Sequence, residues 1–269
     1  MARFTIMGSQ GFIGTRLSCY LRRRNHEVLT PLRGQNPRGA AGHLVYCIGL
    51  TADFSQRPFD TVDAHTSLFA SVLRDTDFES CTYLSSTRLY DSQGGISAAE
   101  EQPLLLEPRN SRHLYDLSKA LSESLGFCCG RNNVRVARLA CVYDDDHDSP
   151  GFLHELMRGV FSGRFEVNSY CNVQRDYVHI SKVCEAIERM ALRGESFTYN
   201  VASGRNTSNA EIFNCIEANT GISIRHLGSL TPEPLPVCVD VTRMREELGI
   251  TPRSVLDDIA KWLGERNAN

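Results

Sequence analysis

The chain has 269 residues, of which 41% are hydrophobic and 23% charged, and its formal net charge is −3. This composition is typical of a globular protein large enough to be stable without disulfide or metal cross-links. The small negative charge excludes the basic surface that binds nucleic acids. No apolar run is long enough to cross a membrane and no signal peptide precedes the first strand. We therefore expect a cytoplasmic protein with neither nucleic-acid nor membrane partners.

Ten cysteines are scattered along the chain, and none of them forms a C-x-x-C pair. Zinc sites need clustered ligand spacings, and the sequence has none. Most of the cysteines fall in apolar strand or helix patterns, where a free thiol behaves as a small hydrophobe. We therefore predict reduced cysteines and no metal site.

Apolar strands and amphipathic helices alternate along the first half of the chain. The patterns predict strands at 4–7, 28–32, 44–48, 81–86 and 134–142, and helices that end near residue 24 or span 60–74 and 114–126. This alternation predicts an α/β fold of the Rossmann type, with a doubly wound parallel sheet.

After residue 144 the pattern changes. The stretch DDDHDSP at 144–150 predicts a solvated acidic loop, although carboxylates beside a histidine could also bind a cation. Beyond it we predict strands at 164–167, 174–180 and 199–201, and helices at 152–161, 182–191, 208–219 (opened by a capping box) and 256–263. We expect residues 146–169 and 205–269 to form a small α+β substrate lobe. Residues 1–145 and parts of 170–204 would then form the dinucleotide-binding domain.

Three glycines follow the first predicted strand at three-residue spacing. Glycines here allow a sharp turn, let a phosphate approach the backbone and let the next helix pack close to the sheet. The N-terminus of that helix attracts an anion. We expect this loop to hold the pyrophosphate of a nicotinamide dinucleotide, although a plain tight turn is the alternative. The loop consists of Gly8, Ser9, Gln10, Gly11, Phe12, Ile13 and Gly14.

The second predicted strand lacks the acidic residue that usually contacts the adenosine ribose. It ends instead in Thr30-Pro31-Leu32-Arg33. A guanidinium suits the 2′-phosphate of NADP(H) through bidentate contacts. Arg33 therefore favours NADP(H) over NAD(H), unless it is only a solvated residue at the end of a strand.

Tyr115 and Lys119 are four residues apart on a predicted helix, so they share one face. A phenol with a pKa near about 10 is a poor base at neutral pH, and a neighbouring ammonium lowers that pKa. Tyr115 could then exchange a proton with a sugar or alcohol oxygen. The strand that ends in Ser85 and Ser86 could supply a hydroxyl to the same oxygen.

With these features the chain resembles the extended short-chain dehydrogenase/reductase family, which contains the nucleotide-sugar epimerases and dehydratases. The resemblance extends from residue 3 to about residue 263. It is carried, in chain order, by Gly8-x-x-Gly11-x-x-Gly14, Ser85-Ser86-x-x-x-Tyr90, Tyr115-x-x-x-Lys119, Arg138-Leu-x-x-Val-Tyr143, Arg175-Asp-Tyr-Val-His179 and Tyr199-Asn-Val-x-Ser-Gly204.

The resemblance implies that Ser86 and Tyr115 act at the reacting oxygen, and that Lys119 also contacts the nicotinamide ribose. It implies that Arg175 contacts the diphosphate of a nucleotide sugar. It also implies a homodimer formed through the two helices that flank the sheet. We further expect cofactor contacts from Gly49 and Leu50, and substrate contacts from Ser85, Arg88 and Cys141.

The chain departs from the family pattern in three ways. Only residues 34–43 lie where a helix, a strand and a helix are usual, so we predict a missing edge strand and a shallower adenosine pocket. Thr87 and Arg88 replace the Asp-Glu pair of 4,6-dehydratases, which argues against water elimination. The usual Arg-x-Gly-Asp stretch is absent from LTPEPLP at 230–236, and Cys141 replaces a usual asparagine.

These features favour an epimerase that oxidises a sugar hydroxyl with Tyr115 as base and returns the hydride to the other face of the ketosugar. An NADPH-dependent ketosugar reductase, with Tyr115 as acid, is the alternative. A non-catalytic NAD(P)-sensing protein is a remoter one, because a sensor need not keep a proton-transfer group. We expect the remaining acid–base candidates to be structural, namely His65, His113, His154 and His179.

Overall fold

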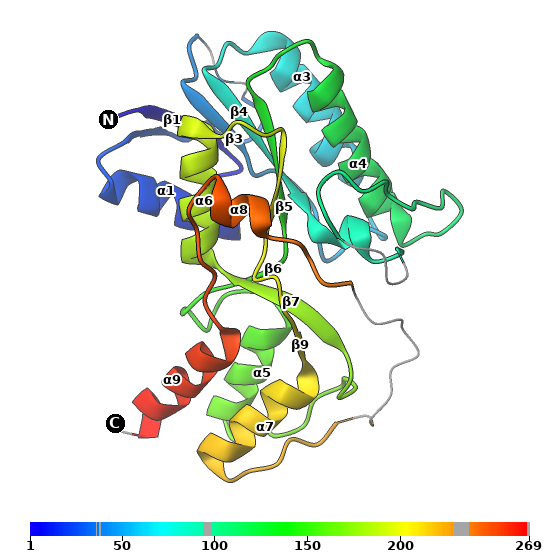
Figure 1. The fold of residues 1–269 in the computed structure, drawn as a ribbon, viewed down its shortest axis with the longest axis vertical. Coiled ribbons are helices and arrows are strands. Elements are labelled where there is room, and N and C mark those ends of the chain that lie inside the picture. The colour runs from blue at the N-terminus through cyan, green and yellow to red at the C-terminus, as the bar shows by residue number, and fades with distance from the viewer. Residues whose placement is uncertain (36, 38, 94–97, 227, 229–236, 268–269) are drawn as a thin grey trace.

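The computed structural model describes residues 1–35, 37, 39–93, 98–226, 228 and 237–267. Six parallel strands form the main sheet in the order β2-β1-β3-β4-β5-β8 (Figure 1). Their bounds are β1 (Arg3–Met7), β2 (Glu27–Leu29), β3 (His43–Tyr46), β4 (Ser80–Ser86), β5 (Val134–Leu139) and β8 (Thr198–Val201). Most residues of the central strands are buried, as expected for a sheet covered on both faces.

Helices cover both faces of this sheet because successive strand side chains point in opposite directions. Phe4 and Ile6 of β1 pack with α1 (Phe12–Arg23) and α6 (Ile180–Arg193). Leu44 and Tyr46 of β3 pack on the other side with α3 (Leu68–Asp75), next to α4 (His113–Cys128). The predicted doubly wound Rossmann-type sheet is therefore confirmed.

Strand β2 forms one edge of the main sheet. It is shorter than predicted because Pro31, which has no backbone N–H, follows soon after it. The described residues between β2 and β3 contribute one isolated bridge, from Ala40 to Asp77, and no further strand. The predicted loss of an edge strand is confirmed.

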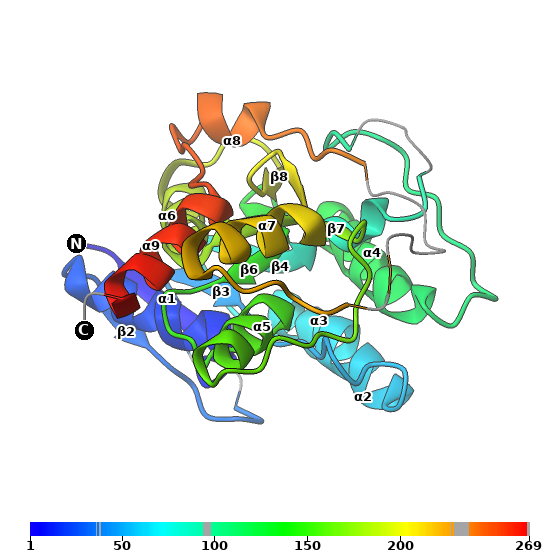
Figure 2. The same ribbon diagram turned by 90° about the horizontal axis from the view of Figure 1, so that it is seen from below.

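A smaller sheet and three helices form a lobe below the carboxyl ends of the main strands (Figure 1). Its strands β6 (Cys141–Tyr143), β7 (Gln174–His179) and β9 (Asn206–Ser208) pack with α5 (Phe152–Phe161), α7 (Asn209–Thr220) and α9 (Val255–Asn267). Figure 2, seen from below, places the three helices in front of the main sheet. Met157, Ile216 and Trp262 lie in their shared core. The predicted capping box of Ser208 and Glu211 opens α7.

Several local predictions are wrong. The strand expected at 134–142 divides at Ala140, because β6 leaves the main sheet to pair with β7. The segment 164–167 is not a strand, since only Glu166 makes a bridge, to Arg225. The helix expected at 60–74 consists of α2 (Pro58–Val62), the π-helical segment η1 (Asp63–Ser67) and α3. Three elements were not predicted, namely β9, the 3₁₀ turn η2 (Thr87–Tyr90) and α8 (Thr242–Glu246).

The structure joins none of the ten cysteines in a disulfide. Within the described part of the chain, no helix combines the length and the apolar character needed to span a bilayer. The segment 230–236, where the sequence lacks the usual Arg-x-Gly-Asp stretch, lies outside the described residues.

Candidate active site

A cavity of about 880 Å³ opens where the main sheet meets the lobe. Its wall is built from segments that follow the carboxyl ends of β1, β3, β4 and β5, where ligands of open α/β sheets bind. The lobe and its connections close the other side. Lining residues of the main domain include Gly11–Gly14, Cys47–Gly49, Ser85–Arg88, Tyr115 and Lys119, and the lobe contributes Cys141 and Arg175.

The glycine loop has the geometry of an anion cradle. Gly8 has φ = +79°, and a Cβ there would lie 2.9 Å from the carbonyl carbon of Cys47. A Cβ on Gly14 would lie 2.3 Å from the Gly8 oxygen, so only glycine lets α1 begin this close to β1. Gly11 is the N-cap of α1 and lines the cavity, which leaves the first N–H groups of the helix accessible to a ligand. The loop therefore fits the pyrophosphate of a dinucleotide.

Of the other predicted cofactor residues, some line the cavity and some do not. Ser9 and Gln10 form the turn between β1 and α1. Gly49 lines the cavity, and a Cβ there would lie 3.4 Å from Nζ of Lys119. Arg33 is exposed in the turn after β2 and does not line the cavity. Its contact with a 2′-phosphate stays a prediction.

Tyr115 and Lys119 lie on the buried face of α4 that forms the cavity wall. Nζ of Lys119 donates a hydrogen bond to the carbonyl of Leu84 at 2.8 Å. Burial lowers the pKa of Lys119 to about 7, although the carboxylate of Glu123 opposes this shift. The ammonium is thus fixed at the carboxyl end of β4.

The pKa of Tyr115 is raised by burial of its phenol. Hydrogen bonds from Ser86 and Thr51 and the charge of Arg88 act against this shift, whereas the charge of Asp116 adds to it. The sequence prediction assigned the opposing charge to Lys119. In the structure Nζ of Lys119 lies 5.9 Å from the Tyr115 ring centroid, and the guanidinium carbon of Arg88 lies at 5.1 Å.

His65 packs edge-on against the Tyr115 ring, with the ring centroids 5.1 Å apart. The N–H of Leu50 donates to Nε2 of His65 at 3.2 Å, and Nδ1 lies 2.7 Å from Oγ of Ser118. Burial, aided by the charge of Lys119, lowers the pKa of His65 to about 3, so its imidazole is neutral. Nδ1 therefore carries the proton. As a buried, fully hydrogen-bonded histidine it fits the structural role predicted for it, and it also connects Leu50 to the wall of the site.

The four predicted substrate residues differ in burial and in the groups that they contact. Ser85 is buried and donates its hydroxyl hydrogen bond to Oε1 of Glu123 at 2.5 Å. Arg88 lies against the Tyr115 ring. Cys141 and Arg175 are exposed on β6 and β7, where the main cavity meets a second one of about 360 Å³.

Several residues of the sequence motifs form a buried network behind β4. Arg138 donates to Oε2 of Glu123 and to the hydroxyl of Tyr90, both at 2.6 Å. Tyr90 donates to Oδ1 of Asn200 at 2.9 Å. This network joins β5, η2, α4 and β8, so these motif residues support the site without lining it together.

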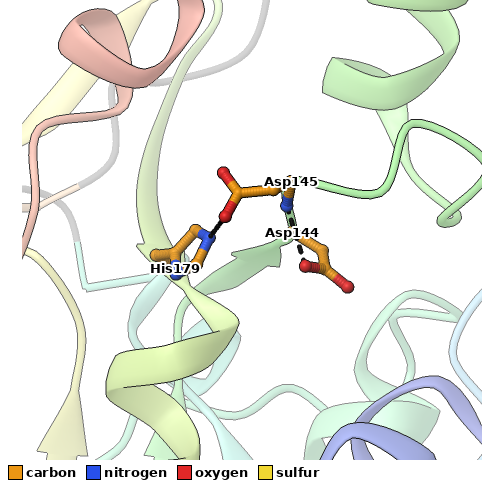
Figure 3. A group of neighbouring side chains, drawn as sticks. All are labelled: Asp144, Asp145 and His179. Carbon is orange, nitrogen blue, oxygen red and sulfur yellow. Dashed lines mark hydrogen bonds and ion pairs between the residues drawn. The ribbon is translucent and has the colours of Figure 1, made fainter. Parts of the chain in front are cut away.

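The acidic loop brings Asp144 and Asp145 close to His179 (Figure 3). Oδ2 of Asp145 lies 3.2 Å from Nε2 of His179. However, Arg16 pairs with Asp144 at 2.5 Å, and Arg253 lies 3.7 Å from Asp145. These two arginines supply the positive charge that a cation would bring, so the cluster joins α1 to the lobe. The prediction of a solvated loop is wrong for Asp144, which is buried.

Comparison with known proteins agrees with this geometry. The chain is 24% identical over 308 residues to a dTDP-4-dehydro-6-deoxy-D-allose reductase from Streptomyces sp, covering 96% of this chain and 94% of the relative. Its fold is similar to the UDP-glucose 4-epimerase of Thermotoga maritima solved with UDP-glucose (TM-score 0.80, 15% identity, 99% of each chain). It is also similar to MoeE5 in complex with UDP-glucose and NAD (TM-score 0.77, 20% identity, 99% of this chain and 100% of the other).

A family model matches residues 43–202, which is more than half of the chain. This match includes Ser86, Tyr115 and Lys119, and it follows the glycine loop that sequence and structure both indicate. The chain belongs to the NAD dependent epimerase/dehydratase family.

Proposed function

We propose that the main cavity binds a nicotinamide dinucleotide and a nucleotide-linked sugar, and that one sugar carbon is oxidised or reduced there. One observation carries the proposal: Tyr115, Ser86 and Lys119 line the same cavity as the start of α1, where no side chain caps the helix. The curated reductase and the solved relatives with UDP-glucose and NAD support this substrate class.

The chain contributes binding and proton transfer to this reaction. When bound, the nicotinamide supplies hydride acceptance or donation. Gly11 and the first turn of α1 would hold the pyrophosphate, and Gly49 leaves room beside Lys119. Tyr115 exchanges its hydroxyl proton with the sugar oxygen, and Ser86 hydrogen-bonds the same oxygen. Lys119 holds Nζ beside Gly49 in the cavity wall, and with a pKa of about 7 it is partly protonated at neutral pH.

We assign the nucleotide to the smaller cavity. Arg175 lines both cavities, which supports a contact of its guanidinium with the diphosphate. Ser169 and Asn209 are polar groups on the lobe side of the smaller cavity. We accordingly propose that the lobe of β6, β7, β9, α5, α7 and α9 binds the substrate and that the main sheet with its helices binds the dinucleotide. Compared with the division expected from the sequence (146–169 and 205–269 against 1–145 with parts of 170–204), β6 moves to the lobe and residues 239–250 pack in the main core.

Two reactions use this proton transfer. We place the ketosugar reductase first, because the missing strand beside β2 leaves the adenosine side less enclosed and a reductant must exchange at each turnover. The curated relative is also a reductase. The epimerase expected from the sequence is the second candidate, and it requires a cofactor that stays bound. Arg33 supports NADP(H) as the preferred dinucleotide only if it reaches the 2′-phosphate.

The first experiment is Tyr115→Phe. The variant should lose turnover by about 10²-fold or more because the general acid is removed. Dinucleotide affinity, measured by fluorescence titration with NADH and NADPH, should stay near the wild-type value. Tyr199→Phe is the matched control, since its hydroxyl donates to Glu247 and its side chain does not line the cavity. Wild-type turnover in Tyr115→Phe would remove Tyr115 from the mechanism.

A second experiment separates the two reactions. The purified protein is passed through gel filtration, its absorbance is recorded, and it is assayed with a dTDP-4-dehydro-6-deoxy sugar and with UDP-glucose. A reductase should emerge without dinucleotide and oxidise added NADPH or NADH with the ketosugar. An epimerase should retain the dinucleotide and convert UDP-glucose without a net change in cofactor.

A further inference from the structure

Arg88 contacts two neighbouring aromatic rings in the cavity wall, those of Phe54 and Tyr115. Its guanidinium carbon lies 4.8 Å from the ring centroid of Phe54 and 5.1 Å from that of Tyr115. Nε lies 3.5 Å from Oδ1 of Asp116, and Nη2 donates to the carbonyl of Arg112 at 3.3 Å. The side chain is only 25% exposed. Its charge therefore has a fixed position over the phenol.

The charged groups that face Tyr115 come from three elements. Arg88 belongs to η2, Asp116 and Lys119 to α4, and His65 to η1. His65 is neutral, and the ammonium of Lys119 is committed to the Leu84 carbonyl at 2.8 Å. Among the described cations near the phenol, Arg88 is thus closer than Lys119, and a guanidinium stays protonated at every working pH.

We propose that Arg88 is a positioning residue whose charge stabilises the tyrosinate form of Tyr115 and whose stacking holds the ring in the cavity wall. The proposal rests on the proposed function, in which Tyr115 exchanges the proton. In reduction the O–H bond of Tyr115 breaks and its proton goes to the sugar oxygen. The hydride comes from the reduced dinucleotide, and the negative charge left on Tyr115 lies beside Arg88. In oxidation the proton returns to Tyr115.

This role differs from the substrate contact predicted for Arg88. Two of its nitrogens already face protein oxygens, those of Asp116 and Arg112. Its guanidinium also contacts the Phe54 and Tyr115 rings, and the side chain is mostly buried, so its charge is directed toward protein groups. The ring contacts and the backbone hydrogen bond from its N–H to Oγ of Ser86 instead connect Arg88 to both proposed proton-transfer groups.

The experiment is an alkaline titration of Tyr115 that needs no substrate. A stopped-flow pH jump records tyrosinate absorbance before the chain unfolds. Subtraction of the same data for Tyr115→Phe isolates the signal of this residue. Arg88→Met keeps an unbranched apolar chain against the two rings, and Arg88→Lys keeps the charge. Arg175→Met removes another arginine from the cavity wall.

In Arg88→Met the titration midpoint should rise by about one pH unit or more, since an opposite charge at this distance shifts a pKa by about 1–3 units. Arg88→Lys should recover most of the shift, and Arg175→Met should leave the midpoint unchanged. An unchanged midpoint in Arg88→Met would overturn the proposal. Loss of turnover in Tyr115→Phe tests the proposed function separately, so either can fail alone.

Discussion

At the scale of single residues, Gly14 and Gly11 differ in how much space surrounds them within one loop. A methyl group on Gly14 would overlap the Gly8 carbonyl, whereas one on Gly11 would lie 3.4 Å from the nearest heavy atom, an ordinary contact. Gly14 is therefore required by the packing of α1 on β1. Gly11 has no such packing constraint, and under the proposed function its missing side chain leaves the first N–H groups of α1 open to the dinucleotide.

We expect Gly14→Ala to lower the free energy of unfolding by about 1–3 kcal/mol, the usual cost of overpacking. Gly11→Ala should cost under about 1 kcal/mol, because alanine is only a poorer N-cap than glycine. Both variants should weaken dinucleotide binding by about tenfold or more, which corresponds to about 1.4 kcal/mol. Urea unfolding and NADH titration measure the two effects. Equal stability losses in the two variants would contradict this difference.

The buried carboxyl of Asp116 should make the free energy of unfolding depend on pH. Burial raises the pKa of its carboxyl from 3.8 to about 6, although Arg88 opposes the shift. The folded state thus binds a proton that the unfolded state has released, and stability falls as pH rises between these two values. In Asp116→Asn this loss should disappear, so the variant should gain about 3 kcal/mol relative to wild type between about pH 4 and about pH 7. Parallel stability curves of the two proteins would refute the prediction.

Some site residues could be predicted from sequence and others could not. The placement of Tyr115 and Lys119 on one helix face could be predicted, because their spacing of four residues alone implies it. The approach of Phe54, His65 and Arg88 to Tyr115 depends on how distant segments pack, and no local pattern encodes that packing. The position of His65 also depends on the π-helical segment η1, whose register a regular helical pattern does not reveal.

At the scale of elements, the Glu123–Arg138 pair joins α4 to β5 behind the catalytic strand. Both side chains are buried, so removal of one leaves an uncompensated charge. Glu123→Ala should lower the free energy of unfolding by about 3–5 kcal/mol. The double variant Glu123→Leu, Arg138→Met should recover much of this loss, because no buried charge remains. Urea denaturation compares the two, and equal losses would show that the charge is not the cause.

The order of strands and helices in the main sheet followed from hydrophobic periodicity, because strands buried on both faces are apolar throughout. Element ends were less predictable. The division of 134–142 at Ala140 depends on β7, which lies far along the chain and pairs with β6. The short strand β9, with its sequence Asn-Thr-Ser, has no apolar pattern and exists because β7 offers a free edge.

At the scale of the whole molecule, large apolar side chains are exposed on the outer helices. Leu68 on α3 and Leu121 on α4 are 42% and 57% exposed. These helices flank the sheet, where the resemblance placed the interface of a homodimer, and that homodimer stays a prediction. We predict that Leu121→Glu converts a dimer into a monomer in light-scattering measurements. Leu192→Glu, at an exposed leucine on α6, should leave the dimer intact. A monomeric wild-type protein would contradict the prediction.

Helix α1 is fixed at both of its ends. Near its N-terminus Arg16 pairs with Asp144 of the acidic loop at 2.5 Å. Near its C-terminus the Tyr20 hydroxyl and Arg24 both contact the carboxylate of Glu188, at 2.8 Å and 2.6 Å. The N–H groups of its first turn are thus oriented before any ligand arrives, so little ordering entropy opposes binding. Association with a dinucleotide should accordingly be a single fast phase, limited by encounter and not by a rearrangement of the helix.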